Sequence, residues 1–358
     1  MKPRKTLSNL EEYVPGTRKA GTVKLSSNEN PFGPSPAAIE AIAEWAPGLA
    51  EYPDGLAREL KAALSRHLGV AQEQLVIGNG SDEVLVLAAA AFVNPGERVV
   101  IPAHTFSQYE FAARLYDARP VFSPMEDGRI LLEEMHALID ENTRMVFVCN
   151  PNNPTGTYIP EDELFDFARQ VPSDVLLVVD EAYREFADAA DFPNAVQLVS
   201  ERDNVLVLRT FSKLYGLASL RVGYGIASPE VTGPMHTVKP PFNTGLLTQK
   251  AATAAIGDTE FVQKTLSNNR TERQRVSAEL SRLGLRQYPS QANFVCTDCR
   301  RDSREFAAEL AEHGVSVRPL SSFGMPTWLR ISIGTSEQNG LLISALEKTL
   351  KRSATAAP

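Results

Sequence analysis

Residues 208–217 read LRTFSKLYGL, and Arg221 follows Lys213 at a spacing of eight residues. The lysine lies among apolar and small residues, with hydroxyl groups before it and a cation after it. Burial and a neighbouring positive charge both disfavour an ammonium group. Such a lysine can be a neutral amine that forms a Schiff base with an aldehyde cofactor. For this stretch taken alone, a surface lysine after a strand is the alternative.

Three apolar runs upstream of this stretch end in polar residues. Residues 175–179 run directly into Asp180, residues 145–149 lead into NPNNPTGT, and residues 75–77 lead into GNGSDE. Such runs predict buried parallel strands, and ligands of open α/β sheets bind at the carboxyl ends of the strands. The glycine-rich turn predicts a helix N-terminus suited to a phosphate, although it matches neither the Walker A nor the dinucleotide fingerprint.

These motifs occur in the order typical of the fold-type I pyridoxal-phosphate aminotransferases. More narrowly, the chain resembles the histidinol-phosphate aminotransferase family, which also includes related aromatic amino-acid aminotransferases. The matching motifs are KLSSNENP at 24–31, YPDG at 52–55, GNGSDE at 78–83, CNPNNPTG at 149–156, DEAY at 180–183, TFSK at 210–213 and LRISIG at 329–334. The resemblance implies the α/β, fold-type I transferase architecture: a large domain with a mostly parallel seven-stranded sheet, and a small α+β domain.

The division of the chain can also be predicted. Alternating strand and helix patterns favour a large, cofactor-binding domain over residues 45–255. A long helical stretch follows, through about Leu283, and leads into a small domain formed by residues 1–44 and 256–358. Further expected strands lie at 98–101, 120–122, 205–208, 291–295, 315–318 and 328–333, and a further helix lies at 302–313.

The composition and net charge of the chain limit the classes of partner that it can bind. With 358 residues, 43% of them hydrophobic, the chain can bury a large core. Its net charge of -8 argues against nucleic acid or an anionic membrane as the main partner. No apolar run reaches the length of a membrane span, and the first residues lack a signal peptide's apolar core, so we expect a cytoplasmic protein. The C-x-x-C pair Cys296 and Cys299 has no supporting histidines, so we expect no metal.

The resemblance assigns the cofactor chemistry to residues in the motifs. Lys213 would hold pyridoxal 5'-phosphate as a Schiff base and move the proton between substrate and cofactor. Asp180 would pair with the ring nitrogen and keep it protonated; a helix cap is its alternative role. Tyr183 and Asn153 would donate hydrogen bonds to the phenolic oxygen. Phe106 would stack on the ring, or else be an ordinary core aromatic.

The cofactor phosphate would be held from two parts of the chain. The groups are the backbone N–H groups of Gly80, Ser81 and Asp82, the hydroxyls of Thr210 and Ser212, and the guanidinium of Arg221. Tyr52, unless it is a packed aromatic, would reach the same phosphate from a second subunit, which implies a homodimer. In the family a proline usually precedes the Thr-aromatic pair; here Ala103 and His104 stand there, so the role of His104 stays open.

Substrate binding is assigned to Arg330, because a planar guanidinium matches a carboxylate or a phosphate ester. The residues expected beside it are Arg318, Tyr13, Asn28, Tyr109, Asn153 and Tyr52. For either arginine, a surface ion pair is the alternative.

The resemblance implies a transaminase that converts L-histidinol phosphate and 2-oxoglutarate to imidazole acetol phosphate and L-glutamate, in histidine biosynthesis. An aromatic amino-acid aminotransferase acting on phenylalanine or tyrosine is the close alternative, and a threonine-phosphate decarboxylase is a third. A cofactor-binding regulator would need a DNA-binding module, yet only about forty residues precede Glu44, most of them already assigned to the small domain. A nicotinamide oxidoreductase is disfavoured by the missing fingerprint.

Overall fold

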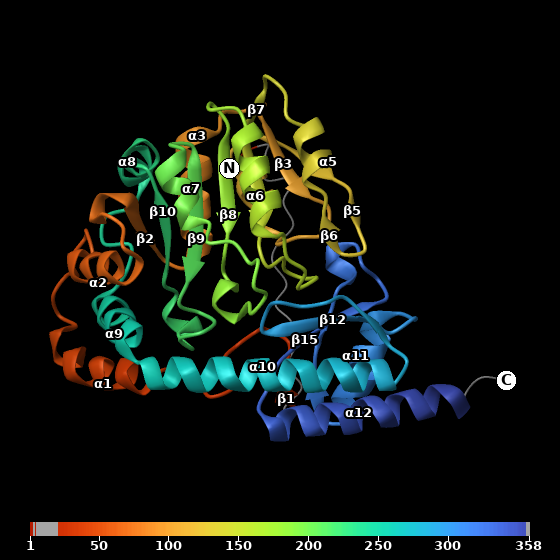
Figure 1. The fold of residues 1–358 in the computed structure, drawn as a ribbon. Coiled ribbons are helices and arrows are strands. Elements are labelled where there is room, and N and C mark those ends of the chain that lie inside the picture. The colour runs from red at the N-terminus through yellow and green to blue at the C-terminus, as the bar shows by residue number, and fades with distance from the viewer. Residues whose placement is uncertain (3, 5–20, 356–358) are drawn as a thin grey trace.

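A seven-stranded sheet forms the centre of the computed structural model, which describes residues 1–2, 4 and 21–355 (Figure 1). Its strands are β2 (Leu75–Gly78), β3 (Arg98–Pro102), β4 (Arg119–Ser123), β7 (Thr143–Cys149), β8 (Leu176–Asp180), β9 (Val205–Thr210) and β10 (Gly223–Ala227). Their order is β2-β10-β9-β8-β7-β3-β4. Only β10 runs antiparallel to its neighbours within this sheet, so the predicted mostly parallel seven-stranded sheet is confirmed.

Helices cover both faces of this sheet, because successive strand residues point to opposite sides. Val146 and Val148 pack into one apolar cluster, and Met145 and Phe147 pack into the other. The first cluster includes residues of α1 (Pro36–Trp45), α2 (Arg58–Leu68), α5 (Leu132–Ala137), α6 (Glu161–Gln170), α7 (Val196–Glu201) and α9 (Leu246–Gly257). The second includes residues of α3 (Ser81–Phe92), α4 (Gln108–Leu115) and α8 (Pro229–Val238). The continuous apolar runs of the sequence are thus strands buried on both faces.

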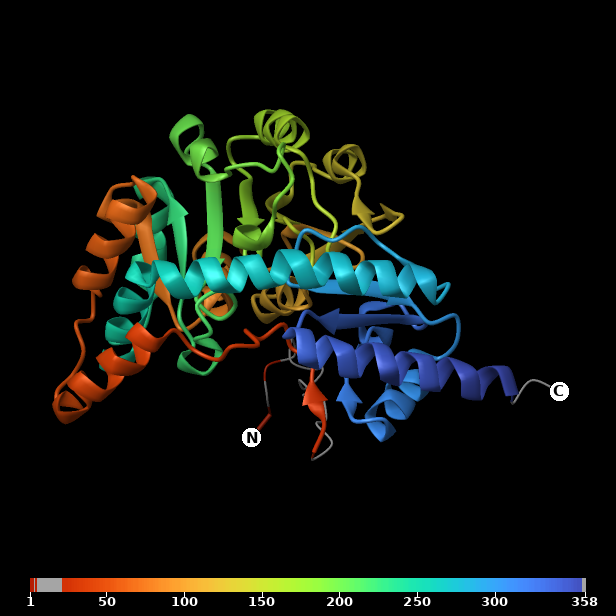
Figure 2. The same ribbon diagram turned by 60° about the horizontal axis from the view of Figure 1, so that its bottom comes forward.

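A smaller antiparallel sheet follows in the second part of the chain. It consists of β11 (Arg286–Gln287), β12 (Phe294–Asp298), β15 (Trp328–Ser332) and β14 (Arg318–Pro319), in that order. Around it lie α10 (Thr259–Arg282), α11 (Ser303–Glu312) and α12 (Ser336–Thr355). Figure 1 shows α10 running past the end of the central sheet toward the small one, and Figure 2 shows α12 alongside it. The boundaries at residues 44/45 and 255/256 stay a prediction.

Two predicted elements differ from the structure. The strand expected at 315–318 is divided: β13 (Val315–Ser316) pairs with β1 (Val23–Lys24), whereas β14 pairs with β15. The long helical stretch is interrupted at Asp258, which separates α9 from α10. The Asp258 side chain accepts a hydrogen bond from the Phe261 N–H at 3.2 Å, so it caps the new helix. A two-stranded hairpin, β5 (Met125–Glu126) and β6 (Arg129–Ile130), completes the strands described.

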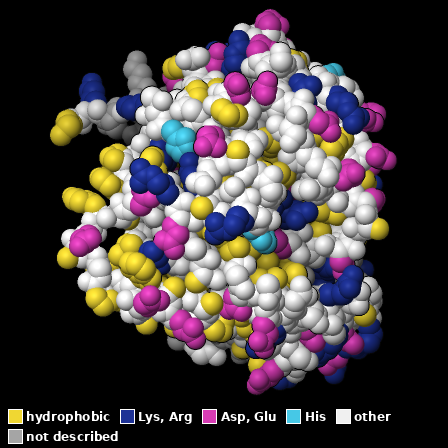
Figure 3. Space-filling view, turned by 60° about the vertical axis from the view of Figure 1, so that its left-hand side comes forward, with side chains coloured by type: hydrophobic (Ala, Val, Ile, Leu, Met, Phe, Trp, Pro, Cys, Tyr) yellow, Lys and Arg dark blue, Asp and Glu magenta, His cyan; other side chains and the backbone are white. Residues whose placement is uncertain are grey.

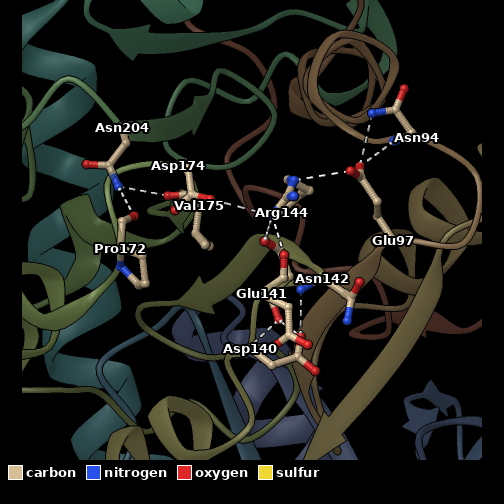
Figure 4. A network of polar contacts seen from close by, with 11 residues as sticks. Asn94, Glu97, Asp140, Glu141, Asn142, Arg144, Pro172, Asp174, Val175 and Asn204 are labelled. Carbon is tan, nitrogen blue, oxygen red and sulfur yellow. Dashed lines mark hydrogen bonds and ion pairs between the residues drawn. The ribbon is translucent and has the colours of Figure 1, made fainter.

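Polar contacts fasten the amino ends of the central strands (Figure 4). Arg144, at the start of β7, forms ion pairs with Glu97 at 3.1 Å and with Asp174 at 3.6 Å. The Asn204 amide donates to the carbonyl oxygens of Pro172 at 2.9 Å and Val175 at 2.8 Å. These contacts join the start of β7 to the segments before β3 and β8, and the segment before β9 to the one before β8. The opposite, carboxyl edge of the sheet carries the residues that the sequence singles out.

No helix between residues 21 and 355 combines the length and the apolar character needed to cross a lipid bilayer.

Candidate active site

Lys213 lies three residues beyond the end of β9, with a half-buried side chain. Its amine donates to the Ser27 carbonyl oxygen at 3.3 Å and lies 5.7 Å from the centre of the Tyr183 ring. Burial, and then the nearby guanidinium of Arg330, lower the pKa of Lys213 to about 8. Arg221 contributes in the same direction. The sequence indicated burial and Arg221 as causes; the structure adds Arg330, from the small sheet, as the stronger of the two cations.

Asp180 ends β8 and is 4% exposed. One carboxylate oxygen accepts a hydrogen bond from the Tyr109 hydroxyl at 2.7 Å, and the other accepts from the Ala182 N–H at 3.0 Å. Burial raises the pKa of Asp180 to about 6, although both hydrogen bonds lower it. A buried carboxylate in this state can pair with a protonated aromatic nitrogen at neutral pH.

Tyr109 lies in the core beside Asp180. Its side chain is fully buried and stacks on Phe147 with ring centres 4.5 Å apart. The side chain has no exposed surface in this structure, and the expected contact with the substrate stays a prediction. Tyr109 contacts Asp180 from within the core.

The polar groups expected at the phosphate lie around Arg221. Its guanidinium donates to the Ser212 hydroxyl at 3.4 Å and forms an ion pair with Asp82 at 3.2 Å. The Thr210 hydroxyl accepts from the Ser212 N–H at 3.1 Å. Arg221 has a φ of 52°, a left-handed conformation that costs a non-glycine residue about 1 kcal/mol. Such strain is typical of functional sites, where it aims a side chain.

The start of α3 lies against the same guanidinium. Gly80 precedes the helix with a φ of 80°, and a Cβ added there would come within 2.5 Å of the Arg221 guanidinium. On β10, a Cβ on Gly223 would come within 2.3 Å of the Ser81 backbone nitrogen. Within the described part of the chain, no side chain caps the first turn of α3. Backbone N–H groups and a guanidinium thus converge where two glycines leave room, as a phosphate requires.

Tyr183 follows β8 and is held from the N-terminal segment. The Asn28 side-chain amide donates to the Tyr183 hydroxyl at 3.0 Å, while the Asn28 side-chain oxygen accepts from the Ser332 hydroxyl at 3.1 Å. Burial raises the pKa of Tyr183 to about 12, so the phenol stays protonated at neutral pH. Asn28 was expected at the substrate; its observed contacts orient Tyr183 and connect to β15.

Arg330 is 8% exposed, and it links the small sheet to the central one. Its guanidinium donates to the Asn153 side-chain oxygen and, at 3.1 Å, to the Ser26 carbonyl oxygen. Arg318 lies directly opposite Arg330 in the pairing of β14 with β15. Directly opposed residues of antiparallel strands share one face of the sheet, so the two expected arginines lie side by side.

Phe106 and His104 lie in the loop after β3. The Phe106 ring meets Tyr109 edge-on, with centres 5.7 Å apart. The His104 ring nitrogen Nδ1 lies 2.7 Å from the Phe323 carbonyl oxygen, so this loop contacts the segment before β15. That contact gives His104 a structural role, which the sequence left open.

Asn152 is a residue that the sequence analysis did not assign. Its amide donates to the His104 carbonyl oxygen at 3.0 Å, and its side-chain oxygen accepts from the Thr105 hydroxyl at 2.7 Å. Asn152 therefore joins two loops that carry expected cofactor residues. The available signal was the pair of adjacent asparagines, which turn chemistry alone did not explain.

Tyr52 lies outside this group of residues. It is 84% exposed, and its ring stacks on that of Phe242 with the ring centres 4.8 Å apart; Leu49 and Leu56, in the same segment of the chain, are also exposed. This segment lies on the side formed by α1 and α2, which faces the viewer in Figure 3 with apolar side chains between charged ones. Tyr13 lies outside the described residues.

The two cysteines of the C-x-x-C pair are buried in and after β12. Burial raises the pKa of Cys299 to about 11 and that of Cys296 further, so both are thiols at neutral pH. Over the described residues, no group of three or more His, Cys, Asp and Glu side chains could hold a metal ion.

Residues 20–346 match the family model described as aminotransferase class I and II. The chain belongs to this family of enzymes, the transaminases. Its relatives include histidinol-phosphate aminotransferases: that of Moorella thermoacetica is 45% identical, over 98% of this chain and 93% of its own. That of a Geobacillus strain is 46% identical, over 96% and 97%. The resemblance to the histidinol-phosphate aminotransferase family is therefore confirmed.

Solved structures agree with the fold. The histidinol-phosphate aminotransferase of Sinorhizobium meliloti, in complex with pyridoxal-5'-phosphate, matches with a TM-score of 0.85 and 30% identity, over 92% of this chain and 91% of that one. A Thermus thermophilus aspartate aminotransferase mutant matches with a TM-score of 0.84 at 23% identity, over 99% of each chain, which shows the shared fold alone. The predicted fold-type I architecture is confirmed.

Proposed function

We propose that this transaminase uses pyridoxal 5'-phosphate to transfer the amino group of L-histidinol phosphate to 2-oxoglutarate, in histidine biosynthesis. The observation that carries the proposal is the Lys213 amine, whose pKa of about 8 leaves a reactive neutral fraction at neutral pH. The amine lies 5.7 Å from the centre of the Tyr183 ring, and the positive charges of Arg330 and Arg221 both lower its pKa.

The residues around Lys213 fit the cofactor's three polar ends. Arg221 and the start of α3 suit the phosphate, because a guanidinium and backbone N–H groups converge there. Asp180 suits the ring nitrogen, and Tyr183 with Asn153 suits the phenolic oxygen. When bound, the cofactor supplies an aldehyde carbon and an aromatic ring that withdraws electrons from the substrate's α-carbon.

Each side chain of the site has its own role in the reaction. Lys213, as a neutral amine, would take the proton from the α-carbon of the amino donor and pass it to the cofactor's aldehyde carbon, and it would move a proton in the opposite direction in the second half of the reaction. Asp180, kept ionised by two hydrogen bonds, stabilises positive charge on the ring nitrogen. Asn28 orients the Tyr183 hydroxyl, and Asn153, whose side-chain oxygen accepts a hydrogen bond from Arg330, would donate to the cofactor's phenolic oxygen.

The paired arginines support two anionic substrates. Arg330 can bind the carboxylate of 2-oxoglutarate in one half-reaction and the phosphate ester of histidinol phosphate in the other. Arg318, beside it, adds charge for the dianionic phosphate. The names of the relatives, which are 45% and 46% identical, favour this substrate over phenylalanine or tyrosine. Threonine-phosphate decarboxylase is represented by a structure 23% identical to this chain, which supports a common fold only.

We further infer a homodimer in which Tyr52 reaches the phosphate of the neighbouring subunit's site. An aromatic side chain that is 84% exposed and stacked on Phe242, in a segment that also exposes Leu49 and Leu56, suits an interface more than a solvated surface. We place this enzyme of amino-acid biosynthesis in the cytoplasm; its net charge of -8 argues against an anionic membrane as its main partner.

A comparison of specificity constants tests the substrate. The purified holoenzyme is assayed with histidinol phosphate, phenylalanine and tyrosine, each with 2-oxoglutarate. We expect histidinol phosphate to have a kcat/KM at least tenfold higher, which corresponds to about 1.4 kcal/mol of transition-state binding. A tenfold preference for phenylalanine would overturn this substrate while leaving the transaminase class intact.

A further inference from the structure

We propose that Tyr109 is a positioning residue that acts on the bound cofactor through Asp180, by fixing and stabilising the carboxylate that faces the ring nitrogen. The inference rests on the proposed use of pyridoxal 5'-phosphate. It gives Tyr109 a role different from the predicted contact with the substrate.

The Tyr109 side chain is held in an orientation that points its hydroxyl at Asp180. The Tyr109 hydroxyl donates to Asp180 at 2.7 Å from a ring with no exposed surface. Phe147 lies parallel to that ring, with an interplanar angle of 6°, and Phe106 meets it at 84°. Because the ring is fully buried and held by two aromatic neighbours, the hydroxyl has little freedom to turn away from Asp180.

Asp180 interacts with several titratable groups. The titratable groups that interact with it are Tyr109 from α4, Cys149 from β7, Asp82 from α3, and Glu181 and Tyr183 from its own segment. None of these five is a cation, and Asp82 and Glu181 both raise the pKa of Asp180. The two groups that lower it are the Tyr109 hydroxyl and the Ala182 N–H. Without cofactor, Tyr109 is therefore the main side chain that favours the ionised carboxylate.

The Tyr109 hydroxyl stays protonated over the working pH range and so remains a hydrogen-bond donor. Burial and the adjacent Asp180 carboxylate hold the pKa of Tyr109 well above its usual value. The neighbouring Cys149 also stays protonated, because burial raises its pKa. Among these three groups, Asp180 alone titrates near neutral pH.

Tyr109 also connects Asp180 to the expected ring-stacking residue. Its backbone N–H donates to the Phe106 carbonyl oxygen at 3.2 Å, in the turn that starts α4. One tyrosine thus contacts both the residue proposed for the ring face and the residue proposed for the ring nitrogen.

Loss of the Tyr109 hydroxyl should weaken cofactor binding to a degree that depends on pH. Removing the hydroxyl raises the pKa of Asp180, so more of it is protonated at pH 6.5 and can no longer pair with a protonated ring nitrogen. At pH 8.5 the carboxylate is ionised with or without Tyr109. Cofactor affinity in Tyr109→Phe should therefore fall mainly at the lower pH.

The experiment measures dissociation constants on the cofactor-free chain at pH 6.5 and 8.5. The ligands are pyridoxal 5'-phosphate and a benzene analogue that has carbon in place of the ring nitrogen. For Tyr109→Phe we expect about tenfold weaker binding of pyridoxal 5'-phosphate at pH 6.5, a loss of less than threefold at pH 8.5, and an unchanged constant for the analogue. Tyr224→Phe, which removes another buried phenol that faces Arg209, is the matched control and should change none of these constants.

Equal losses for both ligands, or a loss independent of pH, would mean that Tyr109 supports only the packing, and would overturn the inference. A double variant with Asp180→Asn gives a second test, because Tyr109→Phe should then have no further effect on binding. If Tyr109→Phe does not fold, a fluorinated tyrosine at position 109 keeps the shape and strengthens the donor; binding at pH 6.5 should tighten, and weaker binding would contradict the inference. Failure of the unmodified chain to bind pyridoxal 5'-phosphate at all would instead overturn the proposed function.

Discussion

Arg318 and Arg330 lie directly opposite one another in the antiparallel pairing of β14 with β15. Their sequence separation conceals this, because the chain between them leaves the sheet and returns. Arg330 is further fixed by Asn153 and by the Ser26 carbonyl oxygen. One guanidinium is thus tied toward the central sheet, while the other is half-buried beside it.

The two arginines should therefore differ in their effect on catalysis. Arg330→Lys keeps the charge but loses the fork that bonds two groups at once, so we expect about a hundredfold lower kcat/KM with both substrates. Arg318→Ala should raise KM for histidinol phosphate about tenfold, with a smaller effect on 2-oxoglutarate. Steady-state kinetics check both, with the exposed Arg58→Ala as control. Equal effects of the two changes on every parameter would contradict the assignment.

The reactivity of Lys213 should follow its lowered pKa. In the cofactor-free chain the amine becomes neutral with a midpoint near pH 8, so adduct formation with a small aldehyde, trapped by borohydride, should rise about tenfold from pH 7 to pH 9. Mass spectrometry of the peptide that contains Lys213 measures the fraction modified. A midpoint near 10.5, the ordinary value for lysine, would show that the amine is not perturbed.

The same shift has a consequence for stability. Between pH 8 and 10.5 the unfolded chain binds more protons at this lysine than the folded one, so the free energy of unfolding rises with pH across that window. Lys213→Met should stabilise the cofactor-free chain by about 2 kcal/mol at pH 7, a value discounted for partial exposure. The gain should shrink above pH 8, and denaturant titrations at pH 7 and pH 10 measure it. A gain that is the same at both values would count against a buried ammonium.

The proposed sharing of Tyr52 can be tested by mixing variants. Tyr52→Ala and Lys213→Ala each impair one part of a site, and a mixed dimer contains one site with both residues intact. Refolding the two inactive proteins together in equal amounts should restore about a quarter of the normal activity per chain. Sedimentation measures the dimer in parallel. No recovery in a mixture shown to contain mixed dimers would contradict a contribution across the interface.

The opposite edge of the sheet should affect stability and not chemistry. Arg144→Ala removes the ion pairs with Glu97 and Asp174 in the network of Figure 4. Because these groups are partly exposed, we expect the free energy of unfolding to fall by about 1 kcal/mol. The kcat/KM of the folded enzyme should stay within twofold. A tenfold loss of kcat/KM would show that this edge is coupled to the site.

Much of the fold was predictable because its strands are buried on both faces. Continuous apolar runs such as residues 145–149 and 175–179 need no periodicity to be identified, and polar residues mark their ends. The order of the motifs supplied the rest. Residues 315–318 were harder, because two short strands that belong to different sheets leave the same apolar signal as one longer strand.

The site residues were predictable in identity more than in contact. Lys213, Asp180 and Arg221 stand in local motifs, whereas the bond between Arg330 and Asn153 joins segments that are distant in the chain. The resemblance placed Tyr109 at the substrate, and the first turn of α4 directs its side chain into the core. Helix geometry decided its role, and spacing alone did not reveal which way it points.

The most direct measurement combines absorption and mass spectrometry on the purified chain after exposure to pyridoxal 5'-phosphate. We predict a coloured protein whose visible absorption disappears on borohydride reduction, with the added mass on Lys213 alone and on no peptide of Lys213→Ala. A chain that stays colourless, or one whose cofactor mass is found on other lysines, would contradict the account.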